Sequence, residues 1–205
     1  MHIHCKRKFF DEVSKSPDPM GFRGHEWPKV HELEDRLGDL TGLVVLEPGC
    51  GAGPLTRLLG DWVGASGRVV ALDSSPGMVA ACREAVGARP NVEVRESSLE
   101  EASLPASAFD LVLCFRMFPH IDDKGSALRR FADCLKPDGR LVIAHIEGRE
   151  ELDRMHAEAG IEVGGDIFPK RPALEGMLAG AGFRASEFID SEDRIFVEAV
   201  LESPR

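Results

Sequence analysis

The sequence predicts an α/β protein with a doubly wound, mostly parallel sheet that ends in an antiparallel hairpin. From residue 43 onward, short apolar runs alternate with segments of helical periodicity. This alternation is typical of parallel strands joined by right-handed crossover helices. Near the C-terminus, residues 183–189 and 194–201 are both strand-like, and only Ser191-Glu192-Asp193 separates them. Strands joined by so short a turn must be antiparallel.

The first 40 residues differ from the rest. Residues 1–22 are polar and interrupted by prolines and a glycine, so we expect little regular structure there and a solvated Lys6-Arg7-Lys8 cluster. A helix should follow, because apolar residues recur at helical spacing as far as Gly42. These residues are Val30, Leu33, Leu37 and Leu40. We therefore expect an N-terminal segment and cap helix over 1–40 and the main domain over 41–205.

The elements of the main domain follow in order. The expected parallel strands are 43–46, 68–72, 92–94, 109–114 and 140–144. Ser75 followed by Pro76 is typical of a helix start, and Pro137 with Gly139 should stop a helix that runs over 122–135. Another helix is expected near 172–181. Residues 145–172 form the longest irregular stretch, which suggests a lid over a ligand.

Composition narrows the functional class. The chain has 205 residues, 43% of them hydrophobic and 29% charged, as in an ordinary soluble domain. Its net charge of −10 argues against a nucleic-acid binder, which would need a basic face. We find no apolar run of membrane-spanning length and no signal-peptide core, so no membrane partner is expected. Five cysteines without a C-x-x-C pair suggest reduced thiols in the cytoplasm.

The most informative motif is a glycine-rich turn after the first strand. Glu47 closes that strand, and the run G-C-G-A-G follows at 49–53 before a helical period begins. Such a turn brings backbone close to a ligand and aims the N–H groups of a helix N-terminus at it. Asp73 ends the next strand twenty residues after Gly53, where it can hydrogen-bond a ribose diol. This order of strand, glycine turn, helix, strand and acidic residue predicts a binding site for a nucleoside cofactor.

The spacing of the glycines distinguishes between the possible cofactors. A dinucleotide fingerprint would read G-x-G-x-x-G, and the carboxylate of Glu47 would repel a pyrophosphate but suit a cation. The run resembles the E/D-x-G-x-G-x-G motif of the class I S-adenosylmethionine-dependent methyltransferases, and the resemblance covers about residues 44–200. It implies a seven-stranded sheet and S-adenosyl-L-methionine, or its product S-adenosyl-L-homocysteine, as ligand.

The resemblance also implies roles for individual residues. The methionine half of the cofactor would lie on the loop, the ribose on Asp73, the adenine near Met78, and the sulfonium near the end of the fourth strand. The implied cofactor residues are Glu47, Gly49, Cys50, Gly51, Gly53, Asp73, Ser74, Met78, Ser98, Leu99, Cys114 and Phe115. The family often has an acid where Ser98 stands. If the alignment with the family is shifted by two residues, an acid occupies this position, because Glu100 and Glu101 follow.

The acceptor is expected to be a small molecule. The stretch from Phe109 through F-P-H-I-D-D to His145 resembles the small-molecule branch of the family, and the N/D-P-P-Y/F motif of DNA amino methylation is absent. The protein would be a monomer or a homodimer. Two alternatives stay open: metal-assisted methylation of a thiol or metalloid, and a sensor or scaffold that binds the cofactor without turnover.

Three histidines are candidates for chemistry. His120 follows the fourth strand and His145 ends the fifth, so both open on one sheet edge, and His156 could fold over them. An imidazole suits a general base because its pKa lies near neutrality, and His120 is the first candidate. The three could instead bind a metal. They could also be structural residues that satisfy nearby backbone groups, and Cys50 and Cys114 could simply be packing residues.

Overall fold

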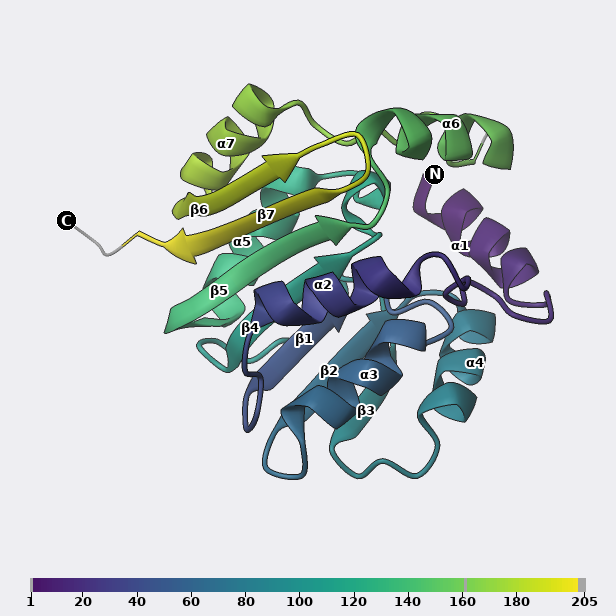
Figure 1. Ribbon diagram of the computed structural model, residues 1–205, viewed down its shortest axis with the longest axis horizontal. Helices are drawn as coiled ribbons and strands as arrows, with labels where there is room; N and C mark the ends of the chain where they lie inside the picture. Colours follow the sequence, from purple (N-terminus) through teal and green to yellow (C-terminus); the bar gives the residue numbers. More distant parts are fainter. Residues whose placement is uncertain (1, 161, 203–205) are drawn as a thin grey trace. The chain divides into compact units, whose positions relative to one another are not determined.

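The computed structural model describes residues 2–160 and 162–202 (Figure 1). The strand order is β3-β2-β1-β4-β5-β7-β6 in a seven-stranded sheet. The strands are β1 (Val44–Pro48), β2 (Arg68–Asp73), β3 (Val92–Glu96), β4 (Phe109–Phe115), β5 (Leu135–His145), β6 (Phe183–Asp190) and β7 (Ile195–Leu201). The α-helices are α1 (His2–Val13), α2 (Trp27–Leu37), α3 (Pro54–Val63), α4 (Pro76–Val86), α5 (Lys124–Cys134), α6 (Arg149–Ala159) and α7 (Arg171–Gly180). The predicted fold class is confirmed.

The chain divides into two compact units. Residues 7–101 make up the first, which we call the amino-terminal unit. The second, the carboxyl-terminal unit, combines residues up to Lys6 with those from Ala102 onward. The division into residues 1–40 and 41–205, with a lid over 145–172, stays a prediction.

In the amino-terminal unit, β1, β2 and β3 are parallel, and α3 and α4 pack on each other and on this sheet. β1 and β2 form because their apolar residues are almost all buried, as in central parallel strands, whereas Val92 and Val94 of the edge strand β3 are only partly buried. Ser75 is the N-cap of α4, where its hydroxyl accepts a hydrogen bond from the N–H of Met78, and Pro76 takes the first position. The four apolar residues expected on the second helix are all buried, although Leu40 lies beyond its end.

In the carboxyl-terminal unit, β4 and β5 are parallel, whereas β7 is antiparallel to both β5 and β6. The predicted hairpin is therefore confirmed. β5 begins earlier than expected, at Leu135, which pairs with Phe109. The register shifts between Phe109 and Leu111, since Leu111 pairs with Arg140, so the segment with Pro137 and Gly139 lies within the strand at this irregularity.

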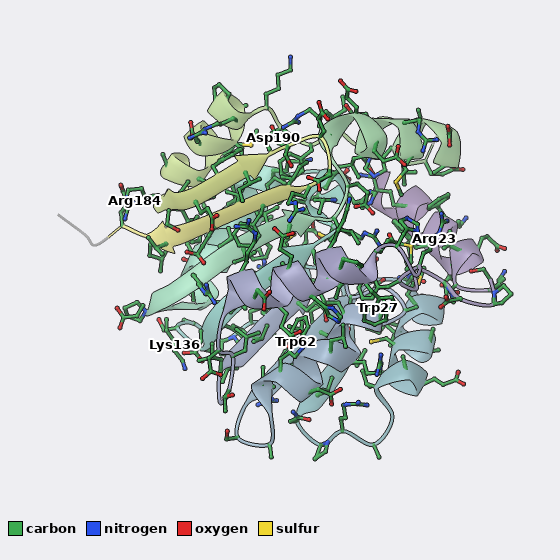
Figure 2. All side chains as sticks on the ribbon, viewed as in Figure 1. Arg23, Trp27, Trp62, Lys136, Arg184 and Asp190 are labelled. Atoms are coloured by element: carbon green, nitrogen blue, oxygen red, sulfur yellow. The ribbon has the colours of Figure 1, made fainter. Side chains whose placement is uncertain are left out.

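Figure 2 shows the two edges of this unit. Lys136 and Arg184 lie where β5 and β6 begin, and Asp190 lies at the other edge, where β6 ends. Asp190 and His145 both pair with Ile195 of β7, so His145 lies at the same carboxyl edge. Arg149 of α6 forms an ion pair with Asp190, at 2.6 Å between Nη2 and Oδ2. The histidines of the candidate site lie at this edge.

Two expectations of irregular structure were wrong. α1 occupies most of the polar N-terminal segment, and α6 lies within the supposed irregular stretch 145–172. Such polar helices depend on tertiary contacts and side-chain pairs rather than on a broad apolar stripe. Asp11 of α1 accepts hydrogen bonds from Ser75 Oγ (2.6 Å) and from the Gly77 N–H (2.9 Å). On α6, Arg154 pairs with glutamates one turn before and after it.

No helix among residues 2–160 and 162–202 is long and apolar enough to cross a membrane.

Candidate active site

The glycine turn of the amino-terminal unit has a backbone that only glycine adopts easily. Gly49, Gly51 and Gly53 have φ angles of 72°, 55° and 84°. At Gly53 the turn also presses on α4, because a Cβ there would lie 2.7 Å from Cys82 Sγ and 3.0 Å from its Cα. The predicted loop therefore forms where the sequence placed it, between β1 and α3.

Three N–H groups of this loop are hydrogen-bonded to β2 and its end. Gly49 and Cys50 both donate to the Leu72 carbonyl, at 2.7 and 2.9 Å. Gly51 donates to Asp73 Oδ2 at 2.9 Å. These three groups hold the loop on the end of β2. They make the loop rigid before any cofactor binds.

Asp73 fixes the loop by accepting the hydrogen bond from Gly51. Its other oxygen, Oδ1, accepts from the Ser75 N–H at 2.9 Å. Burial raises the pKa of Asp73, and the backbone N–H groups of Ser75, Gly51 and Ser74 oppose that shift. Each carboxylate oxygen has two lone pairs, so capacity for a ribose hydroxyl remains. The ribose role of Asp73 stays a prediction.

Glu47 has the most unusual environment of the predicted residues. Its side chain is buried, with 3% of the residue exposed. Within the described part of the chain, its Oε2 has no hydrogen-bond partner. Burial raises the pKa of Glu47 to about 8, although a hydrogen bond with Thr56 opposes the shift. An unpartnered buried carboxylate oxygen is costly in a free protein. It suits a ligand that brings a positive charge, as S-adenosylmethionine does with its ammonium group.

The other predicted cofactor residues of this unit have mixed environments. The Cys50 side chain packs in a core cluster with Ala71, Cys82 and Val86, so a packing role fits its thiol better than ligand contact. Met78 is fully buried.

The structure also brings together both candidates for the adenine amino group. The Glu101 N–H donates to Ser98 Oγ at 3.2 Å, and that hydroxyl hydrogen-bonds the Glu101 carboxylate. Ser74 is half-buried, and Leu99 is buried. The family's usual acid therefore has a counterpart beside Ser98, and the contact itself stays a prediction.

In the carboxyl-terminal unit, Cys114 and Phe115 end β4 and are both buried. Burial raises the pKa of the Cys114 thiol, which keeps it protonated. The next residue, Arg116, has a φ angle of 51° and forms a half-buried ion pair with Glu147, whose Oε2 lies 3.2 Å from Arg116 Nε. A non-glycine residue in this conformation at the end of a central strand is often a functional position. Sequence patterns gave no sign of this pair.

His120 and His156 lie together at the carboxyl edge of this unit, with ring centroids 4.8 Å apart. Both contact Asp166. His120 Nδ1 lies 2.7 Å from Asp166 Oδ2, and His156 Nδ1 lies 2.7 Å from the Asp166 carbonyl oxygen. A carbonyl oxygen only accepts, so His156 carries its proton on Nδ1.

His145 is buried beside them. Its two ring nitrogens have no hydrogen-bond partner among the described residues, and its ring meets that of Phe168 edge-on at 5.5 Å. Burial lowers the pKa of His145 well below its ordinary value, and His120, Arg116 and His156 add to the shift.

The metal site predicted for His120, His145 and His156 is not formed. In residues 2–160 and 162–202 no three His, Cys, Asp or Glu side chains are grouped as metal ligands. The three rings have other contacts instead: His120 and His156 hydrogen-bond Asp166 through Nδ1, and the His145 ring packs edge-on against Phe168.

Lys6 corrects another expectation. Its side chain is only 11% exposed rather than solvated. The ammonium group lies 2.7 Å from Asp166 Oδ1 and 2.7 Å from Asp122 Oδ1, and it donates to the His120 carbonyl at 2.9 Å. Lys6 and Asp166 were missed because no local pattern links positions so far apart in the chain.

Comparison with known proteins agrees with the geometry. Residues 46–143 match a family model described as a methyltransferase domain. A demethylmenaquinone methyltransferase from Lactococcus lactis is 30% identical over 142 residues, which are 66% of this chain and 56% of that protein. Aklanonic acid methyltransferase DauC from Streptomyces is 32% identical over 135 residues, 65% of this chain and 61% of that protein. The matched regions thus span little more than half the length of these relatives.

Among solved structures, a SAM dependent methyltransferase from Aquifex aeolicus superposes with a TM-score of 0.70 at 24% identity, over 84% of this chain and 89% of that one. This similarity concerns the fold. Residues 46–143 therefore match the methyltransferase domain family, and the fold is that of the solved SAM dependent methyltransferase.

Proposed function

We propose that the protein transfers a methyl group from S-adenosylmethionine to a small-molecule acceptor. The observation that carries this proposal is Glu47, a buried carboxylate with an unpartnered oxygen directly before the glycine loop. The named relatives support the acceptor class, because demethylmenaquinone and aklanonic acid are small organic molecules.

The amino-terminal unit would bind the cofactor. Glu47 would hold its ammonium group, and Asp73, fixed by the N–H groups of Gly51 and Ser75, would accept from the ribose hydroxyls. Met78 and the Ser98–Glu101 pair would meet the adenine. When bound, S-adenosylmethionine supplies an electrophilic methyl group on a positively charged sulfur. The protein then contributes mainly proximity and alignment.

His120 would act as general base for an acceptor that must lose a proton. Burial lowers the pKa of His120, opposed by its hydrogen bond with Asp166, which leaves a mostly neutral imidazole at pH 7. A neutral imidazole can accept a proton, whereas an imidazolium cannot. We further expect a cytoplasmic monomer or homodimer without nucleic-acid or membrane partners, with residues 145–172 as a cover over the acceptor.

Calorimetry and turnover test the proposal separately. S-adenosylhomocysteine should bind well and NAD poorly, and comparable or tighter NAD binding would refute the cofactor assignment. Radiolabelled S-adenosylmethionine with a panel of phenols, thiols and amines then separates an enzyme from a protein that only binds the cofactor.

His120→Ala tests the base. It should lower turnover about 10²–10⁴-fold while leaving cofactor affinity nearly unchanged. Normal turnover in a folded His120→Ala protein would exclude the base role.

A further inference from the structure

Lys6, Asp166 and His120 are joined in one chain of contacts within the carboxyl-terminal unit. The two oxygens of Asp166 are divided between the other residues, Oδ1 to Lys6 Nζ and Oδ2 to His120 Nδ1, each at 2.7 Å. Lys6 also donates to the backbone carbonyl of His120. His120 is therefore held through both its ring and its main chain.

We propose that Asp166 is the positioning residue of His120, and that Lys6 fixes Asp166 in that role. A carboxylate accepts only, so Asp166 places the imidazole proton on Nδ1 and the basic lone pair on Nε2. The inference rests on the proposed function for its catalytic consequence. In that reaction the acceptor's X–H bond breaks and its proton moves to Nε2. The electron pair left on X would form the bond to the methyl group while the methyl–sulfur bond breaks, its electron pair returning to sulfur and S-adenosylhomocysteine leaving.

The charges around this pair support the assignment. The groups that face His120 are Asp166, His156, Lys6 and His145. Burial, His156 and Lys6 all disfavour an imidazolium, whereas Asp166 favours it. A base must become positively charged as it takes the proton, and Asp166 supplies the only compensating charge among these groups.

Asp166 itself is ready for this role. Burial alone would raise the pKa of Asp166, but its contacts with His120 and Lys6 outweigh burial and lower it. The carboxylate is therefore ionised at neutral pH. The backbone carbonyl of Asp166 is in turn held by His156 Nδ1, which limits movement of the segment.

The experiment is nitrogen-15 NMR of the full-length protein with labelled histidines, which reports the tautomer and pKa of each imidazole without an acceptor. The His120 signals are assigned by their loss in His120→Gln. In the wild type we expect the proton on Nδ1. In Asp166→Asn we expect the pKa of His120 to fall by about one unit or more, because an opposite charge has been removed. Asp153→Asn, an equal charge change on the exposed face of α6, is the matched control.

Turnover gives the second readout. Asp166→Asn should lower kcat about 10–100-fold with unchanged cofactor affinity and should shift the acid limb of the pH profile. Asp166→Glu should restore part of kcat. Lys6→Met should also lower kcat, because the ion pairs of Lys6 with Asp166 and Asp122 are lost.

The outcomes separate the two proposals. If His120 keeps its tautomer and pKa in Asp166→Asn, as in Asp153→Asn, the positioning role is refuted even where His120→Ala abolishes turnover. If the NMR changes appear but His120→Ala turns over normally, the base in the proposed function is refuted, and the positioning role with it.

Discussion

Glu47 is expected to hold a proton in the free protein and to release it when the cofactor's ammonium group binds. Burial raises the pKa of Glu47 from an ordinary 4.5 to about 8. The shift corresponds to roughly 5 kcal/mol against the ionised form, as an order of magnitude. At pH 7 about nine molecules in ten would carry the proton. A cation placed against Oε2 reverses the preference, because it pairs the carboxylate.

The sign of the pH dependence follows from this shift. The folded free protein binds more protons than the unfolded chain between about pH 4.5 and 8, so the contribution of Glu47 to stability falls as pH rises through that window. Cofactor affinity should change the opposite way. It should rise by about tenfold per pH unit between roughly pH 6 and 7.5. Above that range the cofactor's own amino group begins to lose its proton, with a pKa of about 8.

Calorimetry with S-adenosylhomocysteine in two buffers of different ionisation enthalpy measures the protons released. We expect close to one proton per cofactor at pH 7. Glu47→Gln should abolish both the release and the pH dependence, with weaker binding at pH 7.5. Glu84→Gln, on the exposed face of α4, should behave like the wild type. Binding without proton release in the wild type would refute the reasoning, because Glu47 would then be ionised already or distant from the ammonium group.

Three further substitutions test the site and its frame. Asp73→Asn should weaken cofactor binding by roughly 1.5–3 kcal/mol through loss of a charged acceptor, and an unchanged Kd in the folded variant would show that Asp73 does not bind the ribose. Gly53→Ala should lower the free energy of unfolding in urea by about 1–3 kcal/mol, and by more than Gly64→Ala, because both have positive φ but only Gly53 would strike Cys82. His145→Leu should raise the free energy of unfolding by about 1–3 kcal/mol, and by more at pH 5 than at pH 7. The reason is that the pKa of His145 is lowered in the folded protein, so the wild type loses stability as the pH falls below the pKa of this histidine in the unfolded chain. An equal effect at both pH values would contradict the burial of His145 as a neutral ring.

The sequence by itself determined the fold class and the positions of the glycine loop, Glu47 and Asp73 in the fold. The reason is that both are encoded locally. The glycine loop, Glu47 before it and Asp73 after it lie within one strand–helix–strand unit, and their spacing carries the chemistry. The hairpin was predictable for the same reason, since a turn as short as 191–193 permits one pairing only.

Local patterns were insufficient where tertiary contacts decide the structure. α1 and α6 were missed because their stability comes from ion pairs and distant partners rather than from apolar periodicity. The hydrogen bonds that hold the glycine loop, from Gly49 and Cys50 to the Leu72 carbonyl and from Gly51 to Asp73, were not visible in local patterns.

Only the tertiary structure decided the surroundings of the histidines. The positions of His120, His145 and His156 suggested that they converge at one sheet edge. The rings of His120 and His156 are in direct contact there. Asp166, which hydrogen-bonds His120, and Lys6, which pairs with Asp166, could not be found from the sequence. Hydrogen bonds and ion pairs between residues far apart in the sequence leave no periodic trace in a single chain, because they depend on where the folded elements bring those residues.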